Sequence, residues 1–242
     1  GWTRSGFAPM EAIALDPAED MTVSVVVPDG AAWLRPAVLA VVVEEGYARG
    51  GSVLLFEKPQ TRNPFAGPHV QLRLETRPGG RVEGELRLRH GGREVREPVS
   101  AASGDLPSLT RRFLRAHLQP AQVKVGAAFD EFVLGRVAHL ERDTQRALLH
   151  YERALARDPA MAEAALAMGE LNADLGRTRM ALEMLEGLRA PRMRGRLDAT
   201  QRCRLEMVVA DIDPARIGAD LCGAAQRREA HAATAPRPQL SP

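Results

Sequence analysis

The sequence contains only two cysteines in 242 residues, which excludes both a disulfide scaffold and a four-cysteine zinc site. Its net charge of +2 excludes a strong electrostatic attraction to nucleic acid or to an anionic membrane, so we expect no nucleic-acid partner. The longest apolar run, Ala37 to Val43, is far shorter than the ~20 residues that span a bilayer. Because residue 1 is glycine, we expect a fragment of a larger protein, with any membrane anchor upstream of Gly1.

Common catalytic motifs are also absent. The sequence has no Gly-x-Ser-x-Gly elbow, no His-Glu-x-x-His pair and no phosphate-binding glycine loop. Glu44 and Glu45 are interpreted as a solvated helix face rather than an acid/base pair, because adjacent helical residues point apart. We therefore predict no enzyme activity in this fragment, no catalytic residue, no cofactor and no metal. None of the histidines has a metal-ligand spacing; they stand at positions 69, 90, 117, 139, 150 and 231.

The first half of the chain alternates between apolar and polar residues. This period of two, interrupted by Pro-Gly-Gly and Gly-Gly turns, predicts a β-meander with one solvated face. Leu34 to Tyr47 is valine-rich and compatible with a buried strand, but its length and Pro36 in a first turn favour a helix. The fold class is therefore a small α/β domain over 21–119, a mixed sheet with flanking helices in the order β-α-β-meander-α. The expected strands are 21–27, 53–56, 69–75, 82–88 and 93–99, and the expected helices are 34–47 and 105–118.

The second half is predicted to be all helix and to repeat itself every 34 residues. Gly135 aligns with Gly169, and Ala147 aligns with Ala181. This spacing is typical of helix-turn-helix solenoids. With Tyr151, Ala154 and Pro159 in the first unit and Leu175-Gly176 in the second, residues 126–159 and 160–190 resemble the tetratricopeptide repeat family; Glu131 departs from it, standing where an aromatic residue is usual.

A helical domain over 120–230 would then end in a capping helix pair, 197–230, that hides the last apolar face. Residues 1–20 form an N-terminal arm, and the proline-rich tail, 231–242, is expected to be disordered.

The order of elements in the first half carries a second resemblance. Residues 70–99, followed by Gly104-Asp105-Leu106 and a helix to Leu118, resemble the TolB-like amino-terminal domain that precedes such repeats. That arrangement occurs in CadC-like membrane transcription regulators and in bacterial adenylate-cyclase or kinase fusions. The resemblance implies a non-enzymatic sensor or interaction module on the periplasmic side of a bacterial inner membrane, the alternative location being cytoplasmic. The alternative function is the regulatory half of a signalling enzyme whose catalytic domain lies upstream.

The repeat resemblance also implies a groove for a protein or peptide partner. Tetratricopeptide arrays bind extended peptides along a concave surface formed by the first helix of each unit. The alternative is that the groove is filled by the chain's own α/β domain or final helices, and a homo-oligomer is compatible with either. The matching positions are Phe129, Phe132, Arg136, His139, Glu163, Leu166, Glu170 and Asp174.

The two cysteines allow one disulfide. Cys203 and Cys222 fall on the two helices of the predicted capping pair, nineteen residues apart, so antiparallel packing would bring them together. In an oxidising compartment a bridge here would add ~3 kcal/mol to stability. The alternative is two separate buried thiols. A reactive nucleophile is disfavoured because the sequence offers neither cysteine an evident histidine partner.

Overall fold

The computed structural model describes residues 21–27, 31–49, 53–55, 67–90, 92–118, 125–197, 199–213 and 215. The chain divides into two compact units, Gly1–Pro159 and Ala160–Pro242, and each is described by itself. The predicted N-terminal arm, the disordered tail and the second helix of the capping pair lie outside the described residues.

The first unit contains a five-stranded mixed sheet of order β2-β1-β3-β4-β5. Strand β1 pairs in parallel with both β2 and β3, whereas β3, β4 and β5 form the antiparallel meander expected from the alternating sequence. The predicted order β-α-β-meander-α is confirmed for the described residues. The bounds are β1 Met21–Val26, α1 Leu34–Tyr47, β2 Val53–Leu55, β3 His69–Arg77, β4 Arg81–His90, β5 Arg93–Ala102, the short 3-10 helix η2 Ser103–Asp105 and α2 Leu106–His117.

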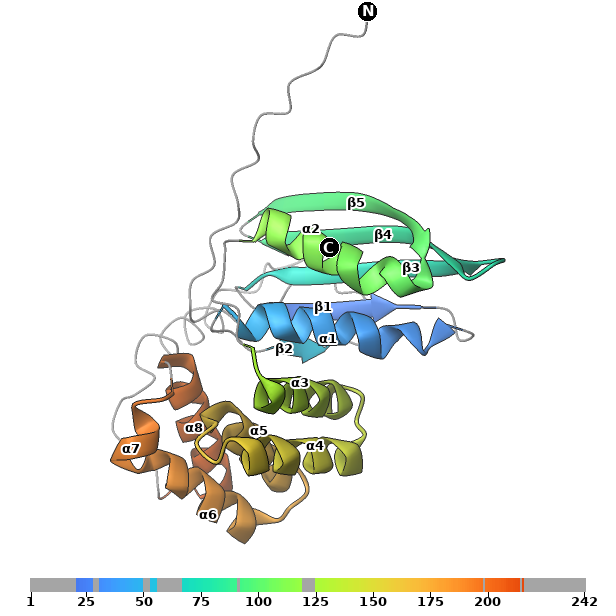
Figure 1. The fold of residues 1–242 in the computed structure, drawn as a ribbon. Coiled ribbons are helices and arrows are strands. Elements are labelled where there is room, and N and C mark those ends of the chain that lie inside the picture. Colours follow the sequence, from blue (N-terminus) through green and yellow to red (C-terminus); the bar gives the residue numbers. More distant parts are fainter. Residues whose placement is uncertain are drawn as a thin grey trace, which may run out of the picture. The chain divides into compact units, whose positions relative to one another are not determined.

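Helices α1 and α2 lie side by side on one face of this sheet (Figure 1). That face carries the apolar row of β3, in which Val70, Leu72 and Leu74 are buried. Helix α1 is buried around most of its circumference, because it contacts β1, β2, α2 and also helix α3, Ala127–Leu140, of the following hairpin. This position explains its run of valines, which a helix with one solvated side would not carry.

The opposite face of the sheet is polar and includes one buried cluster. Along β4 and β5, arginine and glutamate side chains pair, as Glu85 does with Arg87 at 2.6 Å. At the β1 end, Thr22, Ser24 and His69 are buried together. The Thr22 hydroxyl lies 2.9 Å from His69 Nδ1, and the Ser24 hydroxyl lies 3.5 Å from Nε2. The predicted solvated face is thus confirmed for the meander but not for its edge beside β1.

His69 makes the stability of the sheet depend on pH. Burial, and secondarily the positive charge of Arg89, lower the pKa of the imidazole. The unfolded chain takes up a proton as pH falls through about 6.5, while the folded chain resists protonation. The free energy of unfolding should therefore be maintained above that pH and fall below it. Urea denaturation between pH 7.5 and 5.5 measures this dependence of the free energy of unfolding on pH. The His69→Gln variant should show a weaker dependence than the native chain, and an equal dependence would exclude His69 as its source.

Two helical hairpins follow, one in each unit, and their backbones repeat at 34 residues. In the first, the Asp143 amide donates to the Ala138 carbonyl; in the second, the Arg177 amide donates to the Asn172 carbonyl, both at 2.9 Å. The close approach of the helices repeats too. A Cβ on Gly135 would lie 2.5 Å from the ring of Tyr151, and one on Gly169 would lie 2.6 Å from Leu185. The hairpins are α3 Ala127–Leu140 with α4 Thr144–Arg157, and α5 Ala162–Asp174 with α6 Thr178–Arg189.

The turn between the two helices of each hairpin contains one residue in the left-handed backbone conformation, with a positive φ. This residue is Gly176 in the second hairpin, with φ of 70°, but Arg142 in the first, with φ of 63°. A residue with a Cβ is strained there, so Arg142→Gly should raise the free energy of unfolding by about 1 kcal/mol. The reciprocal change Gly176→Arg should lower it by about the same amount. Urea denaturation of both variants checks this, and a destabilised Arg142→Gly variant would contradict it.

The division into units differs from the expected one. The change of sequence period placed the boundary near Pro120, whereas the first compact unit extends to Pro159 and includes α3 and α4. The reason is that α3 packs on α1, which joins the first hairpin to the sheet. The boundary therefore falls between the two similar hairpins rather than before them.

The second unit has its own apolar core. Helix α8, Ala199–Ile212, packs against α5 and α6, and the short helix α7, Pro191–Arg194, follows α6. Leu166, Leu185, Leu205 and Val209 form a buried cluster between these helices. A helix is thus present where the first helix of the capping pair was predicted, and it packs on the apolar side chains of α5.

Candidate functional site

The predicted groove residues of the first hairpin are buried against the chain's own α/β domain. The rings of Phe132 and Tyr47 meet edge to face with centroids 4.8 Å apart. Arg136 Nη2 donates to the Val53 carbonyl at 3.2 Å, and its guanidinium lies 6.0 Å from the Tyr47 ring centroid. Phe129 is buried as well. Phe132 and Arg136 are therefore not open to a peptide in this structure, in agreement with the alternative that the chain fills its own groove.

His139 lies half-buried at the edge of the same contact. Its Nδ1 is 3.3 Å from both the Tyr151 hydroxyl and Arg136 Nη1. The ring therefore links α3 to α4 and also contacts the arginine that binds β2. Of the four predicted positions in this hairpin, only His139 keeps substantial exposure.

In the second hairpin, helix α8 covers the predicted groove positions Leu166 and Glu170. Leu166 packs in the cluster with α8, and Glu170 is buried beneath Arg204, whose Nη2 donates to Glu170 Oε2 at 2.8 Å. Glu163 is half-buried and Asp174 is exposed. The structure therefore does not bring the eight predicted residues together on one open surface.

Glu131, which departs from the repeat pattern, forms an ionic link between the two helices of the first hairpin. Its Oε2 lies 2.8 Å from His150 Nδ1, and its Oε1 lies 3.1 Å from Arg157 Nη2. The hydrogen bond from His150, with the nearby positive charges, lowers the pKa of the Glu131 carboxyl. A charged contact thus replaces the usual aromatic packing at this position.

Cys203 lies on α8 and is buried. Its predicted partner Cys222 lies outside the described residues, so the disulfide remains a prediction. Among the residues that the structure describes, no three histidine, cysteine, aspartate or glutamate side chains are grouped to hold a metal ion.

A cluster of opposite charges on α1 and α2 was missed by the sequence argument. The Glu45 side chain is only 5% exposed, so its interpretation as part of a solvated face was wrong. It accepts hydrogen bonds from Arg49 Nη1 at 2.8 Å and from Arg115 Nε at 2.7 Å. Glu44, more exposed, pairs with Arg111. The i, i+4 spacing of Arg111 and Arg115 was the available signal, but it does not reveal acidic partners almost 70 residues earlier.

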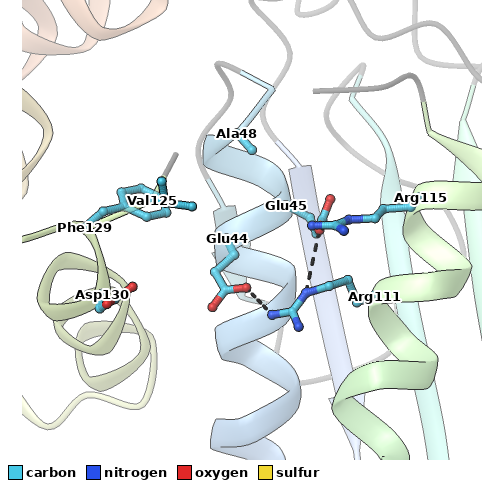
Figure 2. Close-up of a pocket in the computed structure, with 8 residues that line it drawn as sticks. All are labelled: Glu44, Glu45, Ala48, Arg111, Arg115, Val125, Phe129 and Asp130. Atoms are coloured by element: carbon cyan, nitrogen blue, oxygen red, sulfur yellow. Dashed lines mark hydrogen bonds and ion pairs between the residues drawn. The ribbon is translucent and has the colours of Figure 1, made fainter. Parts of the chain in front are cut away.

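Beside this cluster the first unit has a hollow of about 280 Å³. Figure 2 shows Glu44 and Glu45 on α1, with Arg111 and Arg115 extending toward them from α2. The start of α3 supplies a third wall. The lining residues are Glu44, Glu45, Ala48, Arg111, Arg115, Val125, Phe129 and Asp130.

A second hollow, of about 430 Å³, lies between α1 and α3. It is lined by small and apolar side chains, including Ala37, Ala40 and Leu134. An ion pair between Arg35 and Glu141, at 3.0 Å, joins the two helices near it. Glu141, Asp143 and Arg146 also line this hollow, but most of its wall is apolar. Charged side chains make up a larger part of the first hollow, so that hollow is the better candidate for selective binding.

No family model matches the chain, and no curated protein sequence matches it. In the described part of the chain, no helix is both long and apolar enough to cross a membrane.

Proposed function

We propose that this chain is a non-catalytic sensor and interaction module of a larger bacterial signalling protein, and that it binds a protein or peptide partner through its tetratricopeptide-like hairpins. The observation that supports the proposal is the 34-residue repetition of backbone hydrogen bonds and glycine contacts in the two hairpins. Hairpins of this type commonly serve as protein-binding scaffolds. The preceding mixed sheet is compatible with the TolB-like resemblance, from which we infer a location on the periplasmic side of the inner membrane.

The buried groove residues restrict where the partner can bind. Because Phe132 and Arg136 contact Tyr47 and Val53 of the α/β domain, they hold the first hairpin in place rather than recognise a peptide partner. Among the predicted positions, Asp174 is exposed, and His139 and Glu163 are partly exposed. We propose that the polar side chains of each hairpin contribute to recognition separately, His139 in the first hairpin and Glu163 with Asp174 in the second.

Peptide display tests this function. The full chain is screened against a displayed library of peptides, and enriched peptides are titrated against the triple variant His139→Ala, Glu163→Gln, Asp174→Asn. We expect enriched peptides to bind the native chain and to lose most of their affinity for the triple variant. The control is Arg179→Gln, because the Arg179 side chain is 92% exposed and was not predicted in the groove. Absence of enrichment, or equal binding to the triple variant, would exclude the proposal.

Alkylation of the cysteines tests the proposed compartment. A periplasmic module is expected to keep Cys203 and Cys222 resistant to a thiol reagent in the unfolded, unreduced chain isolated from its native host. Full labelling without a reductant would contradict a bridge formed in an oxidising compartment.

A further inference from the structure

The charged hollow of the first unit has hydrogen-bonding capacity that its own ion pairs do not use. Within the described residues, Arg115 donates through Nε alone, to Glu45, so its Nη1 and Nη2 meet no acceptor. Arg111 Nη2 is engaged by Glu44, and its Nε lies 3.9 Å from Glu45, so its Nη1 has no acceptor in the part of the chain that the structure describes. Two guanidiniums on one helix face thus retain donors suited to a carboxylate.

The acidic side of the hollow is also incompletely paired. Asp130, in the first turn of α3, is exposed and forms an ion pair with none of the described cations. Glu44 pairs with Arg111 through Oε2, so its Oε1 remains an acceptor. Figure 2 shows Glu44 on α1 and Asp130 on α3, with the gap between the two helices separating them. A cationic group placed there would meet two carboxylates.

The balance of charge and the size of the hollow restrict the class of ligand that it can bind. Three carboxylates and two guanidiniums line it, so a dianion is disfavoured, while a lone cation would leave the guanidinium donors unused. Its volume of about 280 Å³ lies just below the range of ~300–1,000 Å³ usual for drug-sized ligands. Phe129, Val125 and Ala48 add an apolar wall. These features together match a small zwitterion that carries an apolar group.

We propose that this hollow binds a free α-amino acid with an apolar side chain. Its carboxylate accepts from Arg111 and Arg115, its ammonium group faces Glu44 and Asp130, and its side chain lies against Phe129 and Val125. The site is distinct from the hairpin positions proposed for a partner and does not depend on them, so either proposal can fail alone.

Calorimetric titration of the full chain with four related compounds tests the site. L-leucine carries both charges, isovalerate only the carboxylate, isopentylamine only the ammonium group, and N-acetyl-leucinamide neither. We expect saturable binding of L-leucine and binding at least about tenfold weaker for each of the other three, because each loses at least one charged contact. Arg115→Gln and Asp130→Asn should each weaken L-leucine binding by about tenfold.

Control variants separate a direct effect from a change in folding. Arg112→Gln alters an exposed arginine next to Arg111 that does not line the hollow, and it should bind L-leucine as the native chain does. Circular dichroism of Arg115→Gln and Asp130→Asn should match the native spectrum. The proposal is overturned if L-leucine does not bind, if isovalerate binds equally well, or if Arg112→Gln weakens binding as much as Arg115→Gln.

Discussion

Replacing Glu45 by alanine is expected to lower the free energy of unfolding by about 3 kcal/mol. The Glu45 carboxylate is buried between α1 and α2, where it accepts from Arg49 and Arg115. The Arg49 side chain is itself only 5% exposed, so the substitution leaves a buried guanidinium without this carboxylate. Removing one member of a buried ion pair is costly because the remaining charge has lost its compensation.

The neighbouring residue supplies the matched control. Glu44 pairs with Arg111, but both side chains are more than a third exposed, so Glu44→Ala should cost no more than about 1 kcal/mol. Urea denaturation followed by circular dichroism measures both variants. Equal destabilisation by Glu44→Ala and Glu45→Ala would contradict the structural role assigned to Glu45.

Replacing Gly84 by alanine should destabilise the sheet by about 3 kcal/mol, because the new methyl group has no space. Gly84 lies on β4 opposite Leu74 of β3. A Cβ on Gly84 would lie 2.0 Å from the Arg73 carbonyl oxygen and 3.0 Å from the Leu74 Cα atom. Both atoms belong to the backbone of the paired strand, so the clash can be relieved only if β3 and β4 move apart.

The control for this prediction is Gly104→Ala. Gly104 has no heavy atom within 4 Å of an added Cβ, and its φ is not positive, so this substitution should change stability by less than about 1 kcal/mol. The midpoint of urea denaturation is the readout. A Gly84→Ala variant as stable as Gly104→Ala would show that β3 and β4 do not approach as closely as described.

Local sequence patterns were sufficient to predict the elements of the first unit. Alternation at Val70, Leu72 and Leu74 predicted β3, and Pro36 together with segment length correctly favoured a helix for α1. These inferences depend on residues close together in the chain, because hydrophobic periodicity and the preference of proline for a first helical turn are local properties.

Contacts between residues far apart in the chain could not be predicted from such local patterns. Arg136 binds the Val53 carbonyl from 83 residues away, and Arg115 binds Glu45 from 70 residues away. Neither pairing follows from a periodicity in the sequence, and the residue types of Arg136, Arg115 and Glu45 suit a solvated surface equally well. The groove residues were therefore assigned by resemblance, and the position of α3 against α1 decides how three of them are used.

The docking of α3 on α1 also limits how this architecture can change its number of repeats. A hairpin that contacts only other hairpins is readily duplicated or lost, because each copy presents the same surfaces to its neighbours. The α3–α4 hairpin differs, since Phe132 and Arg136 contact Tyr47 and Val53 outside the repeats. We expect natural variants of this protein to gain or lose whole 34-residue segments after Pro159, and to keep residues 126–159 wherever the sheet domain is kept.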